Sequence, residues 1–308
     1  MNGTGELFAT GPPVSAKGPA PRPAFSGRHH LLGSDFVWAI AFVLPYAAVF
    51  LAFAVYPIGY AVWMGGQPSL YAELIDDPVY QTTVVNTLLF VGIGVNLKMF
   101  LALLLSGFFL RPRWWIRALL VIYLLPWTLA AVQAFISVHW ILIGEPGLVN
   151  RLLEELFGID GPLWFNNRWL ALGSNTAAYI WKWMPFWTVI FLAARMAIPR
   201  EIYEAAGIDG ATGARRFVHV TFPLLANLYL VCTLLSTIWT IGDFNTVYFV
   251  SGGAPGMSTD VLATLAFRYT FDSVRPELGI AAAMSALPVL IPIVIIVVRR
   301  FQTREAQL

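Results

Sequence analysis

Four side chains able to bind a polar solute lie near the end of one apolar run, residues 224–242. They are Ser236, Trp239, Thr240 and Asp243, and their spacing of i, i+3, i+4 and i+7 would place them on one face of a helix. Polar groups in a membrane helix usually face the bundle interior or a water-filled path. An indole ring among hydrogen-bonding groups suits a sugar, whose apolar ring face stacks while its hydroxyls are bound. The four residues therefore predict part of a solute path.

Two neighbouring runs, each interrupted by a proline, add four candidates to this path: Trp127, Lys182, Trp183 and Phe186. The aromatic residues have an alternative role in helix packing or at a membrane interface. A charge inside a membrane needs a partner or a function, so Lys182 and Asp243 either serve the path or pair with each other. For Lys98, the remaining charge within a run, we favour packing over snorkelling to an interface or pairing with another subunit.

The sequence contains no pattern for a metal site, a nucleotide site or a catalytic cluster. The single cysteine, Cys232, allows neither a disulfide within the chain nor a thiolate metal cluster. The four histidines show no metal-binding spacing, and no GxxxxGK[ST] loop is present. We therefore expect no metal, no cofactor and no ATP bound by this chain, and no enzymatic activity of its own.

The elements that must position these residues are six apolar runs. The sequence is 58% hydrophobic and 12% charged, and the charged fraction is about half that of an average soluble domain. Each run is long enough to cross about 30 Å of hydrocarbon, and prolines are tolerated within a bundle. The predicted spans are approximately 36–64, 84–110, 116–141, 169–194, 224–242 and 279–298. The fold class is thus an all-α integral membrane protein.

We expect three regions along the chain. Residues 1–33 are rich in Gly, Pro, Ser and Ala and cannot bury enough apolar surface to fold, so they predict a disordered N-terminal tail. Residues 34–303 form the six-helix membrane domain, and residues 304–308 form a short C-terminal tail.

Basic residues are distributed unevenly between the two sides of the predicted membrane domain. With a cytoplasmic N-terminus, thirteen of the nineteen Lys and Arg residues lie on the cytoplasmic side and four on the other, with two inside the runs. Because cytoplasmic loops carry the excess of Lys and Arg, both termini are expected in the cytoplasm. This orientation also places the loop 195–223 in the cytoplasm.

The loop 195–223 predicts two short helices joined by a turn at the membrane surface. Pro199 suits a first helical turn, and Glu204 lies early enough to complement the helix dipole. Gly207, Gly210 and Gly213 are helix breakers that also allow another surface to approach closely.

This loop resembles the EAA signature of permease subunits of binding-protein-dependent ABC importers. The signature has EAA, three residues, Gly, nine residues and an apolar-x-apolar-Pro ending. Here these are Glu204-Ala205-Ala206, then Gly210, then Val220-Thr221-Phe222-Pro223, with Val220 and Phe222 in place of the more usual Ile and Leu. The resemblance extends over about residues 36–303 and is greatest to the first permease of carbohydrate-uptake systems, including those for maltose and glycerol phosphate.

The resemblance implies a type I ABC importer permease fold with six transmembrane helices and a cytoplasmic EAA coupling helix that docks on a separate ATPase. The implied coupling residues are Glu204, Ala205, Ala206, Asp209 and Gly210. The implied partners are a second homologous permease, two copies of a cytoplasmic ATPase that bind ATP and Mg, and a periplasmic or lipid-anchored solute-binding protein. The resemblance also implies that the chain lies in the inner membrane of a bacterial or archaeal cell, surrounded by membrane lipid, and that no nucleic acid is a partner. The eight solute-path candidates also fall on substrate positions of the family.

The predicted function is therefore a non-catalytic permease subunit that forms half of the pathway for a sugar or related solute. One alternative is import of a glycerol-phosphate-type anion, which Lys182 keeps open. A second is an ion-coupled secondary transporter, which would show inverted repeats and would leave the EAA loop unexplained. A third, an intramembrane enzyme, lacks a catalytic constellation.

Overall fold

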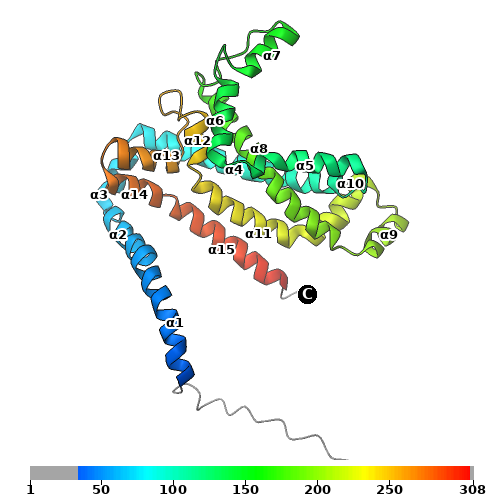
Figure 1. The fold of residues 1–308 in the computed structure, drawn as a ribbon, viewed down its shortest axis with the longest axis horizontal. Helices are drawn as coiled ribbons and strands as arrows, with labels where there is room; N and C mark the ends of the chain where they lie inside the picture. The colour runs from blue at the N-terminus through cyan, green and yellow to red at the C-terminus, as the bar shows by residue number, and fades with distance from the viewer. Residues whose placement is uncertain (1–33, 306–308) are drawn as a thin grey trace, which may run out of the picture. The chain divides into compact units, whose positions relative to one another are not determined.

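A computed structural model describes residues 34–305, and within that range every regular element is a helix (Figure 1). The chain divides into two compact units, Met1–Ile58 and Gly59–Leu308. The tail predicted for residues 1–33 lies outside the described residues. The domain boundary expected at residue 303 falls within the last helix, which ends at Glu305.

The first unit contains α1 (Ser34–Phe50), a five-residue π-helical turn (Leu51–Val55) and the beginning of α2 (Tyr56–Gly65). These elements follow one another without a break and make a 29-residue apolar stretch, Val37–Gly65, long enough to span a membrane. Pro45 lies inside α1.

The second unit contains the remaining helices, whose bounds are α3 (Pro68–Asp76), α4 (Pro78–Phe109), α5 (Trp114–Thr128), α6 (Ala131–Leu142), α7 (Leu148–Phe157), α8 (Arg168–Met196), α9 (Arg200–Ile208), α10 (Gly213–Arg216), α11 (Phe222–Ile241), α12 (Asn245–Val250), α13 (Leu262–Phe267), α14 (Pro276–Met284) and α15 (Leu287–Glu305). Two further π-helical turns lie at Phe217–Thr221 and Arg268–Asp272. The first joins α10 to α11, so that one helical stretch runs from Gly213 to Ile241.

The predicted all-α membrane fold is confirmed, but two of the predicted spans differ in detail. Among the described residues, four stretches are long and apolar enough to cross a membrane: Val37–Gly65, Pro78–Phe109, Gly213–Ile241 and Pro276–Ile296. The run predicted at 116–141 is broken, because α5 and α6 meet at an angle of 99°. Counted as one span, this bent pair makes a fifth.

The fourth predicted span, residues 169–194, corresponds to α8, which is 29 residues long but is not among the helices apolar enough to qualify. The reason is its buried face, which carries Ser174, Asn175 and Lys182 in addition to apolar residues. Helices α4, α8 and α11 pack around a shared core in which Val95, Met99, Ala102, Leu103, Trp187, Phe191, Leu225 and Cys232 are buried. A helix inside such a bundle can carry polar groups because neighbouring helices provide their partners.

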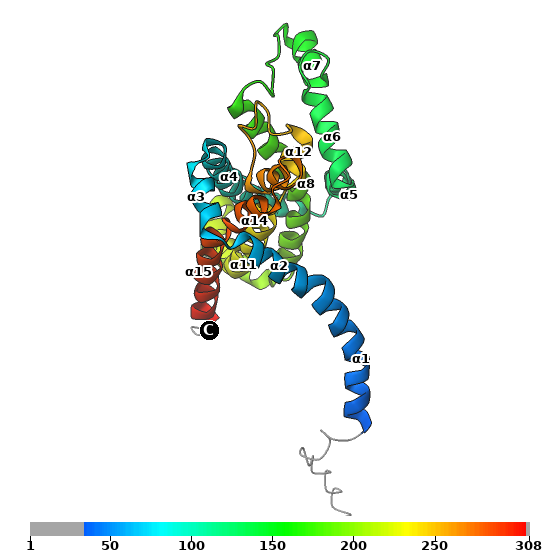
Figure 2. The ribbon, with the colours of Figure 1, turned by 90° about the vertical axis from the view of Figure 1, so that its left-hand side faces the viewer.

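The two ends of the second unit differ in structure and in charge. Helices α9 and α10 lie at one end, and α3, α13 and α14 lie at the other (Figure 1). The end with α9 carries Arg200, Arg215 and Arg216. Helix α7 follows α6 and lies beyond it, away from the bundle, in both views (Figure 1 and Figure 2).

Candidate functional site

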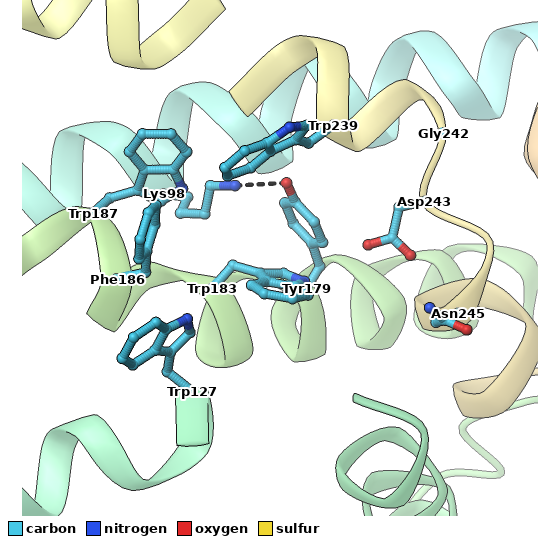
Figure 3. A pocket seen from close by; sticks show the side chains of 10 residues that line it. All are labelled: Lys98, Trp127, Tyr179, Trp183, Phe186, Trp187, Trp239, Gly242, Asp243 and Asn245. Atoms are coloured by element: carbon cyan, nitrogen blue, oxygen red, sulfur yellow. Dashed lines mark hydrogen bonds between the residues drawn. The ribbon is translucent and has the colours of Figure 1, made fainter. Parts of the chain in front are cut away.

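A cavity of about 370 Å³ lies among α4, α5, α8 and the end of α11 (Figure 3). It is lined by Lys98, Trp127, Tyr179, Trp183, Phe186, Trp187, Trp239, Gly242, Asp243 and Asn245. Its volume falls near the lower end of the roughly 300–1,000 Å³ typical of small-molecule sites. An apolar cavity with a few convergent polar groups is the usual form of such a site.

One wall of the cavity is a continuous group of aromatic rings. The Phe186 ring lies 5.6 Å from that of Trp127, 5.0 Å from that of Trp187 and 6.1 Å from that of Trp239, measured between ring centroids. Trp239 remains 54% exposed and Trp127 42% exposed, so both indoles keep accessible surface. Such rings offer flat apolar faces to a solute.

The polar end of the cavity is formed by Lys98 of α4 and Tyr179 of α8. Only 1% of Lys98 is exposed. Its ammonium donates a hydrogen bond of 2.5 Å to the Tyr179 hydroxyl and lies 4.2 Å from the centre of that ring (Figure 3). The Tyr179 hydroxyl is also hydrogen-bonded to that of Thr240. Lys98 is thus buried within the bundle and also lines the cavity.

Asp243 lies after the end of α11, where the chain turns at Gly242. Its carboxylate accepts hydrogen bonds of 2.9 Å from the backbone N–H and from the hydroxyl of Thr246, and so caps the first turn of α12. Asp243 therefore does not continue the face of α11. Ser236 and Thr240 are fully buried behind the cavity wall and do not line it. The prediction that all four residues share one helical face is wrong because the helix ends at Ile241.

Lys182 does not line the cavity either. Its ammonium donates to the backbone carbonyls of Pro126 (2.6 Å), Trp127 (3.2 Å) and Leu129 (2.5 Å). These carbonyls lie where α5 ends and α6 begins, and a helix end leaves its last carbonyls without partners inside the helix. Lys182 therefore provides hydrogen-bond donors to the carbonyls at the bend between α5 and α6. It does not form the ion pair with Asp243 that the sequence left open.

Five of the eight predicted path residues line one cavity: Trp127, Trp183, Phe186, Trp239 and Asp243. Sequence reasoning missed Tyr179, Trp187, Gly242 and Asn245, and it assigned Lys98 to packing. Tyr179 and Trp187 lie four residues before and after Trp183, so helical periodicity around that tryptophan is the signal that would have identified them.

The predicted coupling residues all lie on α9 or at its end. Glu204, Ala205, Asp209 and Gly210 are exposed, whereas Ala206 is buried against its own chain. The helix ends in a Schellman motif, in which the Ala211 N–H donates to the Ala206 carbonyl (2.8 Å) and the Gly210 N–H to the Gly207 carbonyl (3.1 Å). Gly210 has a φ of +74°, which this motif requires and which glycine adopts without strain.

Contacts from neighbouring segments hold α9 to the base of the bundle. The Tyr203 hydroxyl accepts a hydrogen bond of 3.4 Å from Thr221, and its ring lies 5.8 Å from the Arg216 guanidinium. At the end of α8, Arg195 donates to the Leu103 carbonyl of α4 at 2.9 Å. The ends of α4 and α8 and the beginning of α11 therefore meet beside the coupling loop.

The opposite end of the unit is held by a polar network centred on Asn86 of α4. This buried amide donates to the carbonyls of Ser258 and Asp260 and accepts a hydrogen bond of 2.8 Å from Arg168 of α8. The Asp260 carboxylate, fully buried, pairs with Arg268 at 2.7 Å. Burial raises the pKa of the Asp260 carboxyl, and the hydrogen bond from Arg268 opposes that shift.

A second ion pair at this end joins α3 to the segment before α14. Glu73 and Arg275 are linked by a two-pronged hydrogen-bonded pair on the surface. The hydrogen bond from Arg275 lowers the pKa of the Glu73 carboxyl. Because both side chains are exposed, the pair adds little stability by itself.

Comparison with known sequences identifies relatives over most of the chain. The sulfoquinovosyl glycerol transport system permease protein SmoG of Agrobacterium fabrum is 32% identical, with 82% of this chain and 86% of the relative covered. The trehalose/maltose transport system permease protein MalF of Thermococcus litoralis is 31% identical over 80% of this chain and 86% of the relative. The sn-glycerol-3-phosphate transport system permease protein UgpA of Yersinia pseudotuberculosis is 29% identical over 86% and 94%.

Comparison with solved structures confirms the fold. A chain of a bacterial alginate ABC transporter, solved in complex with an alginate pentasaccharide-bound periplasmic protein, superposes with a TM-score of 0.76 at 22% identity. The match covers 85% of this chain and 93% of the other. Residues 36–305 match the family described as binding-protein-dependent transport system inner membrane component. The chain belongs to this family and is a permease subunit of an ABC importer with the type I fold.

Proposed function

We propose that this permease forms half of the pathway for a sugar or related hydroxylated solute and is driven by a separate ATPase that docks on α9. The observation that carries the proposal is the geometry of α9, whose EAA residues Glu204 and Ala205 are exposed at one end of the bundle on a helix ended by the Gly210 motif. The aromatic cavity, with its donor and acceptor groups, supports a hydroxylated solute.

The chain needs partners for this function. ATP and Mg are bound by two copies of a cytoplasmic ATPase, and this chain performs no catalysis. A second homologous permease completes the pathway, and a periplasmic or lipid-anchored solute-binding protein delivers the solute. The similarity to sugar-related permeases such as SmoG and MalF supports this assignment.

The proposed orientation places α9 and both termini in the cytoplasm. The α9 end of the unit carries Arg200, Arg215 and Arg216. At the opposite end, Arg268 and Arg275 are each paired with a carboxylate. This distribution follows the excess of basic residues in cytoplasmic loops.

An anionic solute of the glycerol-phosphate type is the second candidate. The similarity to UgpA and the cationic Lys98 in the cavity favour it. Family membership removes the ion-coupled secondary transporter from consideration, since the family is one of binding-protein-dependent systems.

The coupling role is tested by reversing one charge on α9. The permease is expressed with its partner permease, ATPase and binding protein, and Glu204→Arg is compared with Glu201→Arg. Both glutamates are exposed and lie on the same short helix, so the two variants change its net charge equally. We expect Glu204→Arg to reduce co-purification of the ATPase and transport-coupled ATP hydrolysis in proteoliposomes by at least tenfold. The reason is that a carboxylate docked against a basic residue of the ATPase would be replaced by a positive charge, which that residue repels.

Glu201→Arg is expected to retain most of both activities. If the two variants lose coupling equally, Glu204 has no special role in docking. If the wild-type complex assembles without an ATPase, the proposed function is wrong.

A further inference from the structure

The hydrogen bonds around Tyr179 have a fixed direction that determines what the cavity offers to a solute. The Thr240 hydroxyl donates to the Ser236 carbonyl at 2.5 Å, so its hydrogen is used. The bond between Tyr179 and Thr240 is therefore donated by Tyr179. The Tyr179 oxygen in turn accepts from Lys98. The hydrogens of the Tyr179 and Thr240 hydroxyls are therefore both used in bonds within the protein and are not available to a solute.

Lys98 is consequently the hydrogen-bond donor at the buried end of the cavity. An ammonium group has three N–H donors, and its bond to Tyr179 uses one of them. Within the described part of the chain, no further hydrogen bond is made by its nitrogen. A buried ammonium with free donors is costly unless an acceptor oxygen arrives. A solute that places an acceptor oxygen at the Lys98 ammonium is therefore favoured in this cavity.

Asp243 provides the complementary acceptor. Its two bonds from Thr246 leave lone pairs free, since a carboxylate has about four acceptor sites. Figure 3 shows the Lys98 ammonium and the Asp243 carboxylate on either side of the Tyr179 hydroxyl, and their charges attract each other. The two opposite charges leave this part of the lining without net charge, so Asp243 opposes the attraction of an added anion to Lys98.

We propose that Lys98 and Asp243 bind one uncharged sugar between them, with Lys98 donating to a ring or hydroxyl oxygen and Asp243 accepting from a hydroxyl, and that this pair selects neutral sugars over anionic ones. The inference rests on the proposed function of the same cavity. A sugar hydroxyl both donates and accepts, so a neutral sugar satisfies both groups at once. Its ring stacks on the accessible faces of Trp127 and Trp239.

The test uses the complete transporter with its binding protein in proteoliposomes. ATP-driven uptake is measured for three neutral probes, D-glucose, maltose and trehalose, and three anionic probes, D-glucuronate, glucose 6-phosphate and sn-glycerol 3-phosphate. The variants are Lys98→Met, Asp243→Asn and Tyr179→Phe. Tyr229→Phe, which removes a hydroxyl from α11 away from the cavity, is the matched control for Tyr179→Phe.

Wild type is expected to import at least one neutral probe in preference to its anionic counterparts. Lys98→Met should raise the KM for that sugar about 10- to 100-fold, the range of a hydrogen bond to a charged group. Asp243→Asn keeps the cap of α12 and leaves the Lys98 charge unbalanced, so it should shift the KM ratio toward the anionic probes by at least tenfold. Tyr179→Phe should raise the KM severalfold, and Tyr229→Phe should behave as wild type.

The outcomes separate this inference from the proposed function. If ATP drives uptake of a neutral sugar but Lys98→Met and Asp243→Asn resemble Tyr229→Phe, the selectivity inference is overturned and the function stands. If wild type prefers an anionic probe, the inference is also overturned. If ATP drives uptake of none of the six probes, the proposed function itself fails.

Discussion

Two lysines buried in the membrane domain have different tasks, although each is a single charge within an apolar run. Lys98 has N–H groups free to donate to a solute, whereas Lys182 donates to three backbone carbonyls at the bend between α5 and α6. One of these carbonyls belongs to Trp127, whose ring lines the cavity. Lys182 is therefore a positioning residue for Trp127.

Replacing Lys182 is expected to destabilise the permease. In Lys182→Met the three carbonyls lose a charged donor, which should cost roughly 2–4 kcal/mol. Thermal unfolding in detergent, followed by tryptophan fluorescence, measures the loss. Lys182→Arg retains donors and should lose less. A Lys182→Met protein as stable as wild type but defective in transport would instead restore the direct role in the solute path that the sequence predicted.

Which residues reach the cavity was only partly predictable from the sequence. The predictions for Trp183 and Phe186 come from one apolar run, and both residues line the cavity because α8 is continuous through both. The helical-spacing argument failed for Asp243, because the sequence does not show that α11 stops at Ile241. The two lysines could be recognised as needing partners, but the partners lie 53 to 81 residues away in the chain, beyond the reach of local spacing.

At the scale of elements, the C-terminal end of α9 is fixed by its last residues and by Gly210. The φ of +74° at Gly210 closes the helix end and leaves Asp209 and Gly210 exposed at its tip. Gly207, by contrast, lies inside α9, and a Cβ added there would meet nothing within 4 Å.

Alanine substitutions at these two glycines should therefore act in opposite directions. Gly210→Ala forces a side chain into the left-handed region and should destabilise the helix end by about 1–2 kcal/mol. Gly207→Ala should stabilise α9 by up to about 1 kcal/mol, because alanine is the better helix former. Amide hydrogen exchange across residues 200–211 measures both. Equal protection in the two variants would contradict the structural role of Gly210.

Six apolar runs predicted most of the elements but not their breaks. Apolar composition identifies a stretch able to lie in lipid, and it locates α4 and α11 well. It does not detect the 99° bend between α5 and α6, because residues on both sides of that bend are apolar. The bend is possible because Lys182, from a different run, binds the carbonyls that it exposes.

At the scale of the whole second unit, the end opposite α9 is held by buried polar groups. The Asp260 carboxylate has no exposed surface and depends on Arg268 for its charge partner. Arg268 also donates to the Gly252 carbonyl at 2.7 Å, which ties together both ends of the loop between α12 and α13.

Removing one member of this pair should cost more than removing both. Arg268→Met leaves a buried carboxylate without its partner and is expected to lower the free energy of unfolding by about 3 kcal/mol. The double variant Asp260→Asn, Arg268→Met should recover at least half of that loss. A double-mutant cycle in denaturant titrations gives the coupling, and strictly additive losses would show that the two side chains act independently.

The helical stretch from Gly213 to Ile241 connects the coupling loop to the cavity without interruption. At 1.5 Å per residue its 29 residues extend about 44 Å. If this stretch moves as a rigid body, a small tilt beside α9 displaces Trp239 by an amount that grows with the length of helix between them. The π-helical turn at Phe217–Thr221 lies near the α9 end of this stretch, and the helix can hinge there because its hydrogen-bond pattern changes register. Under the proposed function, the Trp239 ring would then move with the helical stretch that begins beside the proposed ATPase-docking helix α9.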